Sequence, residues 1–156
     1  MRDPARRPAT LVLPPLPYAL ALYAAWRLDR EVWPLPLQLG GANAALGWGL
    51  VGVGLGLFAW TFFAFWRHKT TVNPYVAASC LVVSGPFRFS RNPIYLGDWL
   101  VYAGATLLLG TLWPLAFAPL VWLIIRYGVI RHEERHLRAR FGAEYEAFCA
   151  RVGRWF

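Results

Sequence analysis

Long runs of uncharged, mostly apolar residues alternate with short charged segments along this chain. As a helix, the run over 44–66 would reach roughly 34 Å, which exceeds the hydrocarbon core of a bilayer at about 30 Å. The stretch 94–130 would reach about 55 Å, too long for a single crossing. Because a glycine and a proline interrupt its middle, we predict a helical hairpin over 94–110 and 113–130.

A further span is predicted over 11–26, which is shorter than the other apolar runs. Its three prolines lie near its start, where a helix tolerates them best. The segment 27–43 begins with charged residues and continues with prolines and glycines, so we predict a loop there. The pattern therefore indicates four spans.

Glycines recur along the run 44–66, and Gly52 and Gly56 form a G-x-x-x-G pair. Such a pair allows two helices to approach closely in a membrane. We expect it to pack inside the bundle. Dimerisation of two copies is the alternative, because the motif alone does not identify the partner helix.

The tail, 131–156, is charged but patterned. Its apolar residues recur at intervals of three, four or seven, which predicts one face of an amphipathic helix. They are Leu137, Phe141, Tyr145, Phe148 and Val152, together with Ile130, which directly precedes the tail. Gly142 could divide this helix in two, and its arginines would face water and lipid headgroups.

Composition supports a membrane protein. The chain is 58% hydrophobic and 15% charged, whereas soluble domains are about 45–50% apolar and about 25% charged. We therefore predict a single all-α domain over 1–156, an integral membrane helical bundle with about four transmembrane helices and a C-terminal amphipathic helix.

The net charge of +8 would suit nucleic acid in a soluble protein. Here the basic residues cluster at the edges of apolar runs, so the membrane surface explains them and no nucleic-acid partner is expected. All but two of the 16 Lys and Arg residues lie in the N-terminus, in the loop 67–93, or from Arg126 onward. The positive-inside rule then predicts the cell inner membrane with both termini cytoplasmic. The first residues show no signal-peptide pattern.

The loop 67–93 ends in a segment that could bind a ligand. Asn92 lies at an N-cap position and Pro93 in the first turn of the predicted helix. Free backbone N–H groups at such a helix start favour an anionic or carboxylate-bearing ligand. Phe87 and Tyr95 could stack on a planar base or cover a cation. The alternative is an interfacial turn with aromatic and basic residues that only anchor the chain.

Adjacent acids, Glu133 and Glu134, follow the last span. A carboxylate there could hold an ammonium or sulfonium group, although a solvated run of paired charges is the alternative. His132 and His136 have helical metal-pair spacing but no evident third ligand, so no metal site is predicted. Asp98 lies inside an apolar run and is either functional or paired with a base such as Arg126.

Two blocks resemble the isoprenylcysteine carboxyl methyltransferase and phospholipid methyltransferase superfamily. They are Gly85 to Gly97 and, after the predicted hairpin, Glu133-Glu134-x-x-Leu137 with Phe141-Gly142-x-x-Tyr145. The similarity covers about 67–156. It implies a membrane methyltransferase that takes S-adenosylmethionine from the cytosol and a lipid or lipidated substrate from the bilayer.

The resemblance also implies roles for particular residues. The family segment R-H-P-x-Y wraps the cofactor, and here an asparagine replaces its histidine. The cofactor-binding residues implied in this way are Leu81, Val82, Phe87, Arg91, Asn92, Pro93, Ile94, Tyr95 and Glu133.

Glu134 is the candidate proton acceptor and Arg131 a second candidate catalytic residue. Eukaryotic members carry a substrate-contacting arginine four residues before the family acid, where this chain has Val129, with Arg126 and Arg131 nearby.

Methyl transfer from a sulfonium needs orientation and exclusion of water rather than an enzyme nucleophile. The absence of a Ser-His-Asp or Cys-His pattern therefore does not weigh against this function. A nicotinamide-dependent membrane reductase, with phosphate contacts around Arg88 and Arg91, and a non-catalytic membrane scaffold are the alternatives.

Overall fold

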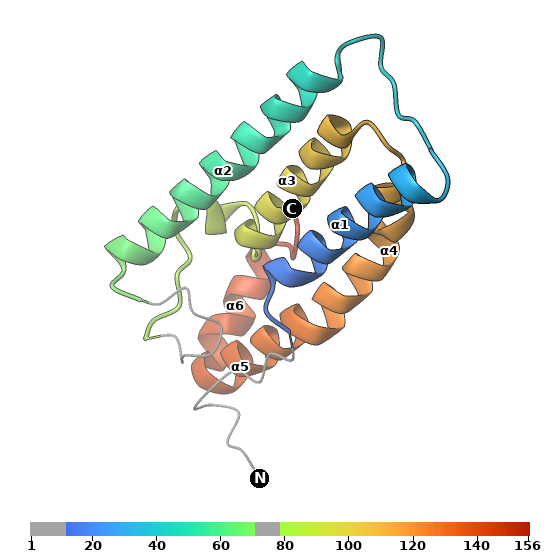
Figure 1. The fold of residues 1–156 in the computed structure, drawn as a ribbon. Helices are drawn as coiled ribbons and strands as arrows, with labels where there is room; N and C mark the ends of the chain where they lie inside the picture. Colours follow the sequence, from blue (N-terminus) through green and yellow to red (C-terminus); the bar gives the residue numbers. More distant parts are fainter. Residues whose placement is uncertain (1–11, 71–78) are drawn as a thin grey trace.

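The computed structural model describes residues 12–70 and 79–156, and within them the chain is all-α (Figure 1). Its α-helices are α1 (Pro15–Glu31), α2 (Asn43–Arg67), α3 (Pro93–Leu109), α4 (Trp113–Ile125), α5 (Arg131–Phe141) and α6 (Ala143–Arg151). A 3₁₀ helix, Gly85–Arg88, precedes α3, and a π-helix, Arg126–Ile130, joins α4 to α5. The predicted fold class is confirmed in this respect.

Two helices within the described residues are long and apolar enough to cross a membrane. They are α2, with 25 residues, and the continuous helix Trp113–Phe141, with 29 residues, whose apolar part ends before the charges of α5. Only 17% and 28% of their apolar windows are buried inside the protein. The core helix of a soluble protein would be mostly buried, so these exposed apolar surfaces suit lipid. α3 is apolar but shorter, with 17 residues.

The first helix differs from its predicted bounds. α1 begins at Pro15 and continues to Glu31, so it includes residues 27–31, which we predicted as loop. Proline is favourable in the first helical turn, and an i,i+4 ion pair between Arg27 and Glu31 supports the last turn. Leu11 and the N-terminal arginines lie outside the described residues, as do residues 71–78 of the predicted cofactor-binding loop.

α2 and α3 lie side by side through paired glycines (Figure 1). A Cβ on Gly54 would come within 2.9 Å of the Gly97 carbonyl oxygen, and one on Gly104 within 2.6 Å of the Gly47 carbonyl oxygen. Glycine at these positions therefore lets the two backbones touch. The expectation that Gly52 packs inside the bundle is wrong. It lies on the opposite face of α2, as does Gly56, with open space where a Cβ would be.

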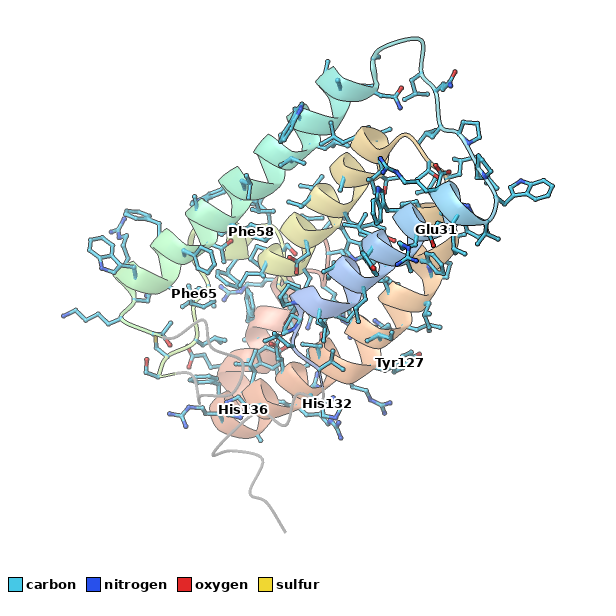
Figure 2. All side chains as sticks on the ribbon, viewed as in Figure 1. Glu31, Phe58, Phe65, Tyr127, His132 and His136 are labelled. Atoms are coloured by element: carbon cyan, nitrogen blue, oxygen red, sulfur yellow. The ribbon has the colours of Figure 1, made fainter. Side chains whose placement is uncertain are left out.

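The end of the bundle that carries Glu31 is tied together by polar contacts. Asp29 accepts hydrogen bonds from the Leu35 amide at 2.9 Å and from the Thr111 hydroxyl at 2.6 Å. Asn43 donates to the carbonyl oxygens of Leu37 and Leu107. Figure 2 shows that Tyr127, His132 and His136 lie at the other end of the bundle from Glu31.

That other end is built by the tail. The predicted amphipathic helix is interrupted at Gly142, which has φ +49°, so it forms α5 and α6. Tyr145 and Phe148 are buried in a cluster with Val82 and Phe87 from the segment before α3. The tail thus covers the start of α3, and the predicted apolar stripe explains why it packs there.

Candidate active site

The start of α3 is held by the C-terminal residues of the chain. The Arg91 amide donates to the Gly153 carbonyl oxygen at 3.1 Å. The Ser90 hydroxyl and the Asn92 side-chain amide both donate to the Arg154 carbonyl oxygen, at 3.2 and 3.1 Å. Asn92 occupies the N-cap position, but its side chain makes no capping hydrogen bond. The Asn92 side chain therefore does not cap the helix as predicted, and instead bonds the start of α3 to the tail.

Glu134 joins this helix start to α5. Its carboxylate accepts two hydrogen bonds from Arg154, at 2.7 and 2.9 Å, and lies 3.8 Å from the Arg91 guanidinium. The Glu134 side chain is only 11% exposed. A fork-to-fork pair of this kind fixes both partners in orientation as well as in position. Arg91 also donates to the Cys149 sulfur, and its buried Nε has no hydrogen-bond partner among the residues that the structure describes.

Glu133 joins the same two helices from a different side. Its carboxylate accepts a hydrogen bond from the Tyr95 hydroxyl at 2.8 Å, and Tyr95 is 5% exposed. Burial raises the pKa of Glu133 to about 7, since the bond from Tyr95 offsets only part of the loss of hydration and the Glu134 charge adds to the rise. A cationic partner would stabilise the ionised form of such a carboxylate.

Three apolar residues that were predicted to contact the cofactor also lie near the start of α3. Val82 and Phe87 are buried, and Leu81 packs partly buried against the same cluster. Phe87 meets the Phe65 ring edge-on at 5.3 Å. The segment before α3 thus forms an apolar surface beside the polar groups in the first turn of α3.

Other predicted residues stand apart from this network. Pro93 is buried in the first turn of α3, and Ile94 is half-buried beside it. The Arg126 guanidinium lies over the Trp122 and Tyr127 rings, and no ion pair joins it to Asp98 in the described part of the chain.

Arg131 is exposed and lines a pocket of about 360 Å³, together with Glu134 and Arg154. The two candidate catalytic residues therefore share one cavity.

Sequence reasoning missed Arg154, Ser90 and Gly153. Arg154 has no motif of its own and resembles the other basic residues of the tail. The bonds that join these residues across the start of α3 and the tail cross more than fifty positions of sequence, and each of them is accepted by a main-chain oxygen that no side-chain pattern records.

A family model described as phospholipid methyltransferase matches residues 42–144. The chain belongs to the phospholipid methyltransferase family. The matched region runs from α2 to the start of α6 and includes the α3 start and both acids, while Arg154 lies beyond it. The superfamily resemblance seen in the sequence is thereby confirmed.

Membership in the phospholipid methyltransferase family indicates a membrane methyltransferase that acts on lipids. No curated protein and no solved structure matches this chain.

Proposed function

We propose that this protein transfers the methyl group of S-adenosylmethionine to a membrane-embedded lipid or lipidated acceptor. One observation carries the proposal: the hydrogen bond from Tyr95, in the first turn of α3, to Glu133 on α5. It joins the two blocks of the sequence that resemble the superfamily, at one end of the bundle. A site formed by both blocks can therefore contact one small molecule.

The polar groups at this point fit the methionine part of the cofactor. That part carries a carboxylate, an ammonium and a sulfonium. The buried Nε of Arg91 lacks an acceptor within residues 12–70 and 79–156, and a carboxylate would supply one. Glu133 accepts a hydrogen bond from Tyr95 and has a raised pKa, so a cation beside it would favour its ionised form.

The remaining predicted contacts form the surroundings of these two groups. Leu81, Val82 and Phe87 would provide an apolar wall for the nucleoside, while Pro93 and Ile94 fix the first turn of α3. Asn92 would act through its bond to the tail, which positions that turn.

The reaction that this arrangement supports is an in-line displacement. The cofactor supplies an electrophilic methyl group: a lone pair of the acceptor forms the new bond to carbon while the carbon–sulfur bond breaks, and its electron pair stays on sulfur as a neutral thioether. Glu133 and Arg91 would orient the donor, and burial excludes competing water. An amine or thiol acceptor would also release a proton, for which Glu134 would be the candidate base, with Arg131 lining the same cavity.

The membrane arrangement that we propose has four crossings. α1, α2, α3 and the helix from Trp113 to Ile130 would all cross the cell inner membrane within one domain, with both termini cytoplasmic. Supporting this, the α2–α3 connection and the tail pack together, and they carry most of the basic residues.

Binding of labelled S-adenosylmethionine to protein purified in detergent tests the proposal. We expect Glu133→Gln to weaken binding at least about tenfold, on the order of one charged hydrogen bond. Glu144→Gln, at an exposed acid of α6, is the matched control and should bind as the wild type does. Wild-type affinity in a Tyr95→Ala, Glu133→Ala double variant would refute the assignment.

The same preparation separates the alternatives. A methyltransferase should gain thermal stability with S-adenosylmethionine and not with NADPH, because ligands stabilise the state that binds them. The opposite result would favour the reductase, and no shift with either ligand would favour the scaffold.

A further inference from the structure

Asp98 is an acid within an apolar helix, and it has no cationic partner in the described part of the chain. It lies in the second turn of α3 and is partly buried. Among the described residues it makes no hydrogen bond and no ion pair. Arg126, the base that could have neutralised it, lies over the rings of Trp122 and Tyr127 instead. Because an ionisable residue inside a membrane segment is costly and usually functional, we looked for its role.

A second polar group beside Asp98 also lacks a partner. The Tyr18 side chain, from α1, is 6% exposed, and its hydroxyl has no hydrogen-bond partner within residues 12–70 and 79–156. Its ring meets the rings of Trp99 and Tyr102 edge-on, at 5.3 and 5.8 Å, which fixes it against α3. The Asp98 charge acts on the Tyr18 hydroxyl. Since a buried polar group without a partner costs free energy, the two groups together indicate a site for a ligand with a proton to donate.

This site adjoins the contact between Tyr95 and Glu133. Tyr95 precedes Asp98 by three residues on α3, so their side chains are neighbours on the helix surface. The Asp98 charge also acts on the Tyr95 hydroxyl, which donates to Glu133. Asp98 therefore lies beside the pair to which we assign the cationic part of the cofactor, on the side where α1 packs against α3 (Figure 1).

The shared pattern of the family does not account for this pair. The family match begins at residue 42, so α1 and Tyr18 precede it. Asp98 lies within the match, but the first block of the superfamily resemblance ends at Gly97, directly before it. The pair is thus a feature of this chain's own residues.

Proton transfer is the step for which the other acids near α3 are already engaged. Both oxygens of Glu134 accept hydrogen bonds from Arg154, at 2.7 and 2.9 Å, so a base there would have to break a fork-shaped pair. Glu133 accepts from Tyr95 and would also face the cation of the cofactor. Asp98, by contrast, has both oxygens available among the described residues.

We propose that Asp98 is the proton acceptor of the methyl transfer and that the Tyr18 hydroxyl holds the reacting group of the acceptor against it. This rests on the proposed function, with an acceptor whose reacting nitrogen or sulfur carries a proton. The Asp98 carboxylate takes that proton and becomes a carboxylic acid, which frees the lone pair that forms the new bond to carbon. The carbon–sulfur electron pair stays on the donor sulfur, and the carboxylic acid returns its proton to water before the next turnover.

A hydrophobic carbodiimide tests this carboxyl group without any acceptor. Dicyclohexylcarbodiimide reacts with protonated carboxyl groups in apolar surroundings, and peptide mass spectrometry locates the adduct. In protein purified in detergent we expect Asp98 to be labelled, faster at low than at high pH, and Glu144, an exposed acid of α6, to stay unlabelled. Absence of the adduct on Asp98 would overturn the proposal.

The pH dependence of labelling needs a reference, because other titratable groups face Asp98. They are Tyr18 from α1, Tyr95 from α3 and Glu133 from α5, whereas α2 has no titratable side chain before Arg67. Glu133→Gln removes the group that titrates near neutrality. The pH dependence at Asp98 should persist in this variant, and its loss would assign the proton to Glu133 instead.

Kinetics test the role of Asp98 in transfer. The probes are phosphatidylethanolamine, hexadecanethiol and N-acetyl-S-farnesylcysteine, which offer an amine, a thiol and a carboxylate. With the amine or the thiol, Asp98→Asn should lower kcat at least about a hundredfold, as loss of a general base does, without changing KM for S-adenosylmethionine. Asp98→Glu should restore part of kcat, and Tyr18→Phe should lower it about tenfold, on the order of one hydrogen bond. Glu144→Gln is the control and should match the wild type.

The outcomes separate this proposal from the proposed function. Unchanged kcat in folded Asp98→Asn protein would overturn the base, as would transfer to the carboxylate probe alone, because that reaction has no proton to accept. If Asp98→Asn does not fold, Tyr18→Phe, which keeps the ring contacts, replaces it, and if no probe is methylated, the carbodiimide result decides. Failure of the wild type to bind S-adenosylmethionine would refute the proposed function, whereas cofactor binding with intact kcat in Asp98→Asn would refute only the base.

Discussion

Glu133 is partly buried, and among the described residues it accepts a hydrogen bond from Tyr95 alone. In the free protein its pKa is raised to about 7, chiefly by burial. The ionised form prevails above that pH and attracts a cation, while the protonated form below it does not. Cofactor affinity should therefore depend on pH near neutrality through this residue.

Lowering the pH from 8 to 6 should weaken S-adenosylmethionine binding, with up to about a tenfold loss per pH unit below 7. Equilibrium binding across this range checks the expectation. Because the ligand's own amino group also titrates, Glu133→Gln is the reference: it should bind more weakly at pH 8 and lose the part of the pH dependence that belongs to the protein. Identical profiles for the two proteins would contradict a role for Glu133.

Arg154 should stabilise the protein through Glu134. Replacing either residue with glutamine leaves the other without its fork-shaped partner, so each change should lower the free energy of unfolding by about 1.5–3 kcal/mol, with a smaller loss in the double variant than the two single losses added together. Unfolding in detergent measures this coupling.

The ion pair of Arg138 with Glu146 gives the matched control for that coupling. Both side chains are about half exposed, at 50% and 54%, so their coupling should be below about 1 kcal/mol. Equal coupling free energies in the two pairs would show that burial of Glu134 does not strengthen its interaction with Arg154.

These residues also show how far the sequence predicts the site. Tyr95 and Glu133 were predicted because each lies in a block with a recognisable pattern, and the structure brings them into contact. Arg154 was not predicted, because the sequence around an arginine near a chain end does not differ according to whether the side chain faces water or a buried acid. Asn92 lies where an N-cap was predicted, but tertiary contact with the tail replaced the local bond.

At the scale of the helices, the packing of α2 against α3 depends on which glycines face each other. The sequence offered a G-x-x-x-G pair at Gly52, whereas the structure uses Gly47 and Gly54, seven residues apart, against Gly97 and Gly104 on α3. Spacing of seven and spacing of four both place residues on one side of a helix, so the pattern alone could not identify the packed face.

Gly54→Ala and Gly104→Ala should each destabilise the bundle, because the added methyl group would overlap main-chain oxygen of the facing helix, at 2.9 and 2.6 Å. The expected cost is about 1–3 kcal/mol, typical of an overpacked core. Gly52→Ala is the control, since its Cβ meets open space, and alanine favours a helix over glycine by about 1 kcal/mol. Thermal unfolding in detergent compares the three. Equal loss in all three variants would contradict the packing.

The sequence predicted the helices better than their ends. α2 and α3 match the predicted spans closely, because hydropathy changes abruptly at their ends. α1 continues through charged residues that hydropathy excluded, because an ion pair of Arg27 with Glu31 supports its last turn. The Thr111 hydroxyl donates to Asp29 and ties this turn to the connection between α3 and α4.

On the scale of the whole molecule, the two ends of the bundle differ in charge and in role. One end holds Asp29, Asn43 and the short connections that they fasten. The other end holds the start of α3, α5, α6 and the arginine-lined pocket. A cytosolic cofactor and a lipid from the bilayer can meet only if this second end faces the cytoplasm at the membrane boundary.

Cysteine labelling in cells tests that orientation. In a background where Cys80 and Cys149 are replaced by alanine, Trp33→Cys, at a position 67% exposed between α1 and α2, should react with a membrane-impermeant maleimide from outside the inner membrane. Arg151→Cys, on α6, should react only after permeabilisation, because basic segments of membrane proteins tend to be retained in the cytoplasm. The reverse pattern would place the candidate site outside. Labelling of both positions only after permeabilisation would mean that the connection between α1 and α2 also lies on the cytoplasmic side. The four-span arrangement would then be wrong, even if the protein binds the cofactor.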